Sequence, residues 1–201
     1  MKIISISLTV FILAFCGCAS SSVSKTWKSP SYSGGAVAKI AVLVKSDRDF
    51  YRQAIENYFA SILTEEGQSA FTTHDLFALS ALKADRAGAV ARLRDVGADS
   101  VLVVRLVDAP TYSRQATVTS PAFTSSAAES YGYLVMETDA AWNTLQSDVY
   151  IENSLYNLAN SERLWSGVTR TVLKENTDSV AKIEPLAKKL FAEMRQAGVI
   201  H

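Results

Sequence analysis

The chain has 201 residues, of which 48 % are hydrophobic and 20 % are charged, and its 20 basic groups balance 20 acidic ones. This length and apolar fraction indicate one globular domain and exclude a chain that is disordered throughout. The zero net charge lacks the basic excess typical of nucleic-acid-binding proteins, so we expect no nucleic-acid partner.

The amino terminus has the pattern of a secretory signal. Lys2 precedes a run of about a dozen mostly apolar residues, Ile3 to Phe15, which is typical of a signal peptide. The run is too short for a transmembrane helix, which needs about 20 apolar residues. It ends in the sequence Phe15-Cys16-Gly17-Cys18.

A glycine directly before a cysteine at this position resembles the lipobox of bacterial lipoproteins. The resemblance implies a signal peptide over residues 1–17 and acylation of Cys18, which makes the membrane a partner through a lipid anchor. Acylation of Cys16 and ordinary secretory cleavage near Ala19 are the two alternatives. Under the sorting rule of enterobacterial lipoproteins, Ala19 after the acylated cysteine implies the periplasmic face of the outer membrane.

Both cysteines of the chain lie in this targeting segment. The remaining sequence therefore has no thiol for a disulfide, a zinc site or a nucleophile. Residues 18–35 are expected to form a flexible tether behind the anchor, because seven of the 17 residues from Ala19 to Gly35 are serines. Trp27 interrupts this pattern, and we expect it to dock on the domain; a partner anchor is the alternative.

Residues 36–201 are expected to form a single α/β domain with a long insertion at 109–147. Apolar runs and one short segment predict three strands, and helical spacing of apolar residues predicts two helices between them. This alternation predicts a parallel sheet. The expected strands span residues 36–44, 69–72 and 100–108. The first expected helix begins after residue 48 and is about 17 residues long, and the second spans residues 85–96.

The last part of the chain predicts an antiparallel hairpin and a closing helix. Residues 148–158 and 163–173 have strand character, and turn-forming residues join them. The closing helix is expected to run to about Ala197, and it either begins near Pro185 or bends there. The fold class is therefore a mixed five-stranded sheet, with three parallel strands plus the hairpin, flanked by about three helices.

This arrangement resembles the amino-terminal domain of TolB, the domain of curli-secretion lipoproteins, and a family of uncharacterised bacterial lipoproteins. The resemblance implies a sheet order of 2-1-3-4-5 with the fourth strand antiparallel to the rest. None of the segments that carry it is a catalytic motif. They are Cys18, Trp27–Gly34, Lys39–Val44, Gly97–Val103, Glu152–Tyr156 and Leu164–Gly167.

One polar cluster is expected where the first and third strands end, which is where α/β folds bind ligands. Arg105 stands out because it interrupts an apolar run, and a buried charge needs a partner. The cluster is either a structural ion pair with helix-capping residues or a site for a small anionic ligand. Its members are Lys45, Ser46, Asp47, Arg48, Arg105 and Asp108.

Known catalytic and metal-binding patterns are missing from the sequence. His74 and His201 stand apart, so we expect no transition-metal site, and we expect His74 in a surface loop. There is no Gly-x-Ser-x-Gly elbow, and the loop after the first strand has no glycine to approach a phosphate. We therefore expect no cofactor, no metal and no catalytic residue.

The insertion at 109–147 is far longer than the two to six residues that usually join such elements. Its first part, to residue 130, has nine serines or threonines among 22 residues. Its second part is richer in apolar residues, and Tyr131, Tyr133 and Trp142 are candidates for contact with an envelope protein partner. Packing on the same chain is the alternative.

The sequence thus favours a lipid-anchored periplasmic envelope lipoprotein with a binding or assembly role and no catalysis. The first alternative is a sensor that binds a small ligand. The second is an envelope hydrolase that uses Asp47 or Asp108, which requires one carboxyl pKa to be shifted by burial.

Overall fold

The computed structural model describes residues 21–46, 48–107, 148–172 and 183–201. Asp47, Asp108, Cys18 and the insertion at 109–147 lie outside these ranges. Over the described residues the elements are β1 (Ser21–Lys28), β2 (Lys39–Lys45), α1 (Asp49–Glu65), β3 (Ser69–Thr72), α2 (Leu79–Ala84), α3 (Arg86–Asp95), β4 (Ser100–Val107), β5 (Asp148–Asn157), β6 (Arg163–Val172) and α6 (Ile183–Gln196).

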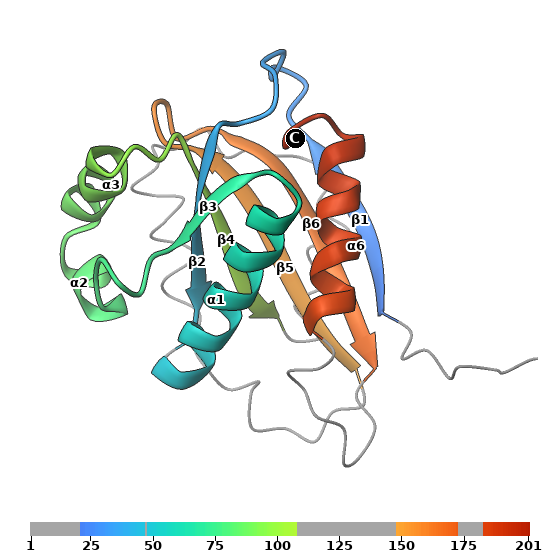
Figure 1. Ribbon diagram of the computed structural model, residues 1–201, viewed down its shortest axis with the longest axis horizontal. Coiled ribbons are helices and arrows are strands. Elements are labelled where there is room, and N and C mark those ends of the chain that lie inside the picture. Colours follow the sequence, from blue (N-terminus) through green and yellow to red (C-terminus); the bar gives the residue numbers. More distant parts are fainter. Residues whose placement is uncertain (1–20, 47, 108–147, 173–182) are drawn as a thin grey trace, which may run out of the picture.

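These strands form one six-stranded mixed sheet in the order β1-β6-β5-β4-β2-β3 (Figure 1). Strands β3, β2 and β4 pair in parallel, whereas β5 is antiparallel to both β4 and β6. The sheet order expected for five strands is confirmed, including the antiparallel fourth one. The number five is wrong, because β1 adds a sixth strand beside β6.

The expectation of a flexible tether is wrong for residues 21–28, which form β1. This strand pairs antiparallel with β6, from Ser21 opposite Thr171 to Lys28 opposite Trp165, with a bulge between Ser24 and Trp27. Serine-rich composition predicts solvated side chains, but an edge strand needs only its backbone groups to complete the sheet. Trp27 does dock on the domain, because the Arg163 guanidinium lies 4.7 Å from its ring centroid.

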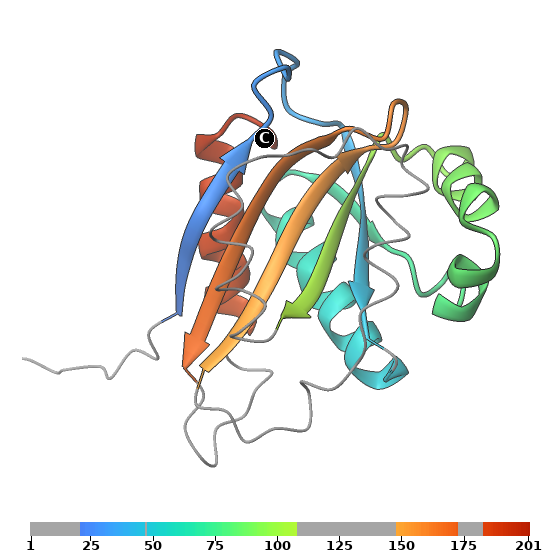
Figure 2. The same cartoon turned by 180° about the vertical axis from the view of Figure 1, so that it is seen from behind.

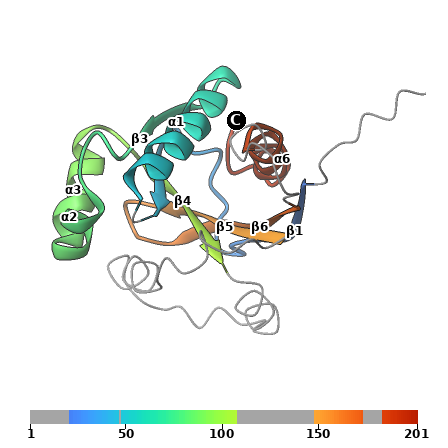
Figure 3. The ribbon, with the colours of Figure 1, turned by 90° about the horizontal axis from the view of Figure 1, so that it is seen from below.

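The two faces of the sheet bury different helices. Figure 3 shows α1 and α6 side by side on one face, where α1 packs on β2 and α6 packs on β1 and β6. Alternate residues of β2, such as Ile40 and Val42, belong to the core cluster on this face. The intervening residues Ala41 and Leu43 face the other way and pack with α2 and α3. The described residues form four helices where about three were expected, because α2 is only six residues long and its two buried leucines, Leu79 and Leu82, are too few to show a helical period.

The other helices follow the predicted pattern. α1 begins at Asp49 and ends at Glu65, and Gly67 follows it with a φ of +87°, a conformation that favours glycine. In α6, Pro185 lies in the first described turn, so the described helix begins near it as expected. Among the described residues, no helix is long and apolar enough to cross a bilayer.

The sheet has two opposite ends, which are defined by the strands that start or finish there. The carboxyl edge is the end where β2, β4 and β6 finish, where β1 starts at Ser21 and where α1 begins (Figures 1 and 2). The amino edge is the opposite end, where β2 and β4 start and where the β5–β6 turn lies.

Candidate functional site

The structure brings the described members of the predicted cluster to the carboxyl edge. Lys45, the last residue of β2, pairs in register with Arg105 of β4. The Ser46 hydroxyl is buried and accepts a hydrogen bond from the Arg48 backbone N–H at 3.2 Å. Arg48 is exposed, and its guanidinium lies 5.8 Å from the Tyr51 ring centroid. Asp47 and Asp108 are outside the described residues.

Arg105 is held in an ion pair across the sheet. It is 4 % exposed, and its register partner on β5 is Glu152. Arg105 Nε donates to Glu152 Oε2 at 2.7 Å, and Nη2 contacts the same oxygen. The interpretation of Arg105 as part of a structural ion pair is confirmed, and an anionic ligand at this position would have to compete with Glu152.

A second polar cluster at the carboxyl edge was not foreseen from the sequence. It is centred on Glu56 of α1, whose side chain is completely buried. Glu56 Oε1 accepts hydrogen bonds from the Val44 backbone N–H at 3.0 Å and from Arg52 Nε at 2.9 Å. The Thr73 hydroxyl donates to the same oxygen at 3.0 Å.

The other carboxylate oxygen of Glu56 binds the loop that follows β3. Glu56 Oε2 accepts from the backbone N–H groups of Thr73, at 2.9 Å, and His74, at 2.7 Å. Arg52 completes the cluster by donating from Nη2 to the Thr73 hydroxyl and the Phe77 carbonyl. A carboxylate has about four acceptor positions, so Glu56 is saturated and joins α1, β2 and the β3–α2 loop.

His74 lies in a loop, as expected from the sequence, but its side chain belongs to this cluster and is not open to the surface. Its side chain is 13 % exposed. Its Nδ1 lies 3.0 Å from Glu56 Oε2, and its Nε2 lies 3.3 Å from Asp75 Oδ1. The imidazole is therefore fixed between a buried carboxylate and an exposed one, and its orientation is set by both.

The sequence carried a signal for this cluster in the spacing of α1. Arg52 and Glu56 are four residues apart and share the helical stripe of Ile55 and Phe59, which faces the core. Two opposite charges at this spacing on a buried stripe predict a buried ion pair. The apolar members of the stripe alone do not reveal it.

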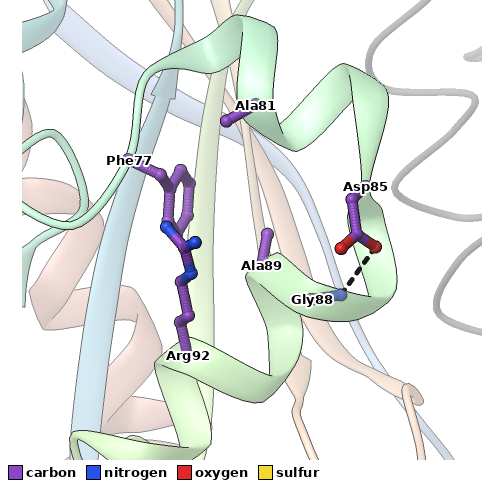
Figure 4. Close-up of a pocket in the computed structure, with 6 residues that line it drawn as sticks. All are labelled: Phe77, Ala81, Asp85, Gly88, Ala89 and Arg92. Atoms are coloured by element: carbon purple, nitrogen blue, oxygen red, sulfur yellow. Dashed lines mark hydrogen bonds between the residues drawn. The ribbon is translucent and has the colours of Figure 1, made fainter.

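A small hollow of about 70 Å³ lies between α2 and α3 (Figure 4). Asp85 caps α3 there, and its Oδ1 accepts from the Gly88 backbone N–H at 2.8 Å. A Cβ at Gly88 would lie 2.2 Å from Asp85 Oδ2, so glycine allows this cap. The hollow holds space for only a few waters, and Phe77, Ala81, Asp85, Gly88, Ala89 and Arg92 line it.

Two further observations concern the chemistry of the described part of the chain. Within it, no three His, Cys, Asp or Glu side chains gather as metal ligands. Burial raises the pKa of the Tyr156 hydroxyl above its ordinary value, so this buried group on β5 is held as a neutral phenol. Its register partners are Val101 of β4 and Arg163 of β6.

No protein-family model and no curated protein sequence matches the chain. Solved structures with a likeness to it include two PelC dodecamers from Paraburkholderia phytofirmans, one of them a point variant. The variant is 13 % identical over 85 % of this chain and 96 % of its own, with a TM-score of 0.49. The other is 12 % identical over 90 % of this chain and 100 % of its own, also with a TM-score of 0.49.

A third likeness is to the lipoprotein GNA1162 from Neisseria meningitidis. It is 15 % identical over 80 % of this chain and 98 % of its own, with a TM-score of 0.43. Because all three scores lie below 0.5, these likenesses assign neither a family nor a function to the chain. The resemblance to the TolB and curli-secretion domains stays a prediction.

Proposed function

We propose that the chain is an envelope lipoprotein, anchored by acyl chains on Cys18 at the periplasmic face of the outer membrane. The observation that carries this proposal is the apolar run that ends in Gly17-Cys18. Two or more acyl chains hold a protein stably at a membrane, whereas one does so only marginally. Ala19 after the cysteine supports the outer membrane as the destination.

We further propose that the protein works by binding or assembly and is not an enzyme. The two buried ion pairs described above support this, because both are committed to structural roles. Arg105 is paired with Glu152, and the Glu56 carboxylate is saturated by Arg52 and backbone donors. A general acid or base needs a proton-accepting position open to its substrate, and Glu56 has none.

Membrane fractionation of variants tests the anchor. Cys18→Ser is expected to leave the domain soluble or uncleaved, and Cys16→Ser is the matched control that is expected to stay acylated and in the outer membrane. Mass spectrometry of the amino-terminal peptide identifies the modified residue. Loss of acylation in Cys16→Ser, or recovery of the native protein with the inner membrane, would contradict the proposal.

The binding role is tested through the insertion at 109–147, which contains Tyr131, Tyr133 and Trp142. We propose that these aromatic residues contact an envelope protein. Replacing 109–147 by a short glycine-serine turn is then expected to keep the melting temperature and the anchor but to abolish cross-linking in cells. A triple alanine variant of the three aromatic residues is the milder test. Unfolding of the shortened chain, or undiminished cross-linking, would count against this role.

A further inference from the structure

The carboxyl edge carries a large apolar side chain that the domain leaves open to water. Phe50, in the first turn of α1, is 75 % exposed. Among the described residues, the other large apolar side chain classed as exposed is Val96, at 38 %. Val96 caps α3 at the amino edge, where its carbonyl accepts from Lys39 Nζ at 2.7 Å. The more exposed of the two therefore lies at the carboxyl edge.

The neighbours of Phe50 give this site an interfacial composition. The Phe50 and Tyr51 rings meet edge to face, with centroids 5.7 Å apart. The exposed Arg48 guanidinium lies over Tyr51. An aromatic pair with an adjacent cation is typical of residues at the headgroup level of a bilayer. Asp49 lies between Arg48 and Phe50 in the sequence, and its negative charge offsets the charge of Arg48. Net positive charge is therefore not what distinguishes this edge.

The start of the sheet brings the anchor to the same edge. Ser21, the first residue of β1, pairs with Thr171 near the end of β6, at the carboxyl edge. Cys18 is three residues before Ser21, so the two Cα atoms are at most about 11 Å apart. A lipid on Cys18 therefore holds the carboxyl edge, rather than the amino edge, next to the bilayer.

We propose that the carboxyl edge is a membrane-contact surface, with Phe50 inserted at the headgroup level of the bilayer that holds the anchor. This inference rests on the proposed acylation of Cys18. It turns the amino edge, with Val96, toward the periplasm. Because apolar insertion and not charge sets the orientation, the contact is expected to persist at high salt.

A depth measurement on the full acylated protein tests the orientation. Processing removes Cys16, and acylation occupies the Cys18 thiol, so one introduced cysteine is labelled alone. Phe50→Cys and its matched control Val96→Cys are each labelled with an environment-sensitive fluorophore. The proteins are reconstituted in vesicles of phosphatidylethanolamine and phosphatidylglycerol that contain lipids with a nitroxide quencher near the headgroup.

The label at Phe50 is expected to be quenched several-fold more strongly than the label at Val96, in low and high salt alike. Equal quenching at the two positions, in protein that floats with the vesicles, would overturn the membrane-contact surface while leaving the anchor intact. Protein that does not float would overturn the anchor itself. A Phe50 label that is unquenched in vesicles but shielded in native outer membranes would instead identify a protein as its partner, and would also overturn the proposal.

Discussion

At each edge of the sheet, one glutamate side chain accepts hydrogen bonds from distant segments, but the two glutamates differ in burial. At the carboxyl edge, Glu56 is fully buried and its acceptors are filled by Arg52 and by backbone donors of two segments. At the amino edge, Glu162 is only half-buried and accepts from the hydroxyls of Ser29, at 2.6 Å, and Ser31. Both glutamates join segments that are distant in the sequence.

This contrast shows that burial determines how much a hydrogen-bonded carboxylate contributes to the free energy of unfolding. Removing a buried carboxylate leaves its several donors unsatisfied, at a cost of about 1–3 kcal/mol for each such group. When a half-buried carboxylate is removed, its donors can bind water instead, at little cost. The carboxyl edge is therefore expected to depend on Glu56 far more than the amino edge depends on Glu162.

The largest expected effect comes from removing the Glu56 charge. Glu56→Gln leaves Arg52 as a buried cation and turns an amide N–H₂ toward other donors, so the free energy of unfolding is expected to fall by about 3–5 kcal/mol. Urea unfolding of the Cys18→Ser chain measures this. Glu65→Gln, an exposed position of the same helix, is the matched control. If the two variants lose equal stability, the Glu56 cluster does not hold this edge.

A smaller loss of stability is expected when the second ion pair of the carboxyl edge is broken. Arg105→Met leaves Glu152 without its strand partner, and the expected loss is about 2 kcal/mol because Glu152 keeps some access to water. Adding Glu152→Met is expected to recover most of this loss, since the two side chains lie in register. A double-mutant cycle by urea unfolding measures the coupling. Additive losses would show that the pair is not coupled.

At the amino edge the expected stabilisation depends on pH and is lost in acid. Hydrogen bonds from Ser29 and then Ser31 hold the pKa of Glu162 below its ordinary value. A lowered folded-state pKa means that this stabilisation is fully present above the unfolded pKa of about 4.3 and is lost as the pH falls through the folded value.

Thermal unfolding between about pH 7 and pH 3 checks this sign. Glu162→Gln is expected to be less stable than the parent chain near neutrality, and the difference is expected to shrink as the pH falls. Ser31→Ala, which removes one donor, is expected to give the same pattern with a smaller amplitude. A difference that grows in acid would reverse the sign and contradict the assignment.

The smallest effect is expected at Phe50. Phe50→Ser changes an exposed side chain, so the free energy of unfolding in water is expected to change by no more than about 0.5 kcal/mol. Phe59→Ala, nine residues later on the buried face of α1, is the contrast, with an expected loss of about 3–5 kcal/mol. A large loss at Phe50 would mean that the residue belongs to the fold rather than to a contact surface.

The local patterns of the sequence predicted much of the fold. The apolar runs of β2 and β4 and the helical spacing of α1 placed these elements correctly, because burial on one or both faces imposes a period that is visible over a few residues. The short strand β3 and the helix α3 were also predicted. Their order in the sheet followed from a resemblance, and the structure has the same order.

The pairings between distant residues could not be predicted in this way. Residues 21–28 carry the composition of a linker, and only the open edge of β6 makes them a strand. Arg105 was correctly expected to need a partner, but its partner Glu152 is 47 residues away. Nothing in the local sequence of either residue specifies the other.

The sequence by itself determined the targeting pattern, the α/β class and the positions of most elements, since these depend on neighbours within a few residues. The tertiary structure alone decided that the first strand closes the sheet and that Glu56 is saturated by α1, β2 and the β3–α2 loop. It also decided that β1 starts at the same edge of the sheet at which α1 begins (Figure 1). Strand register and helix placement are long-range properties, so the surfaces they create appear only after folding.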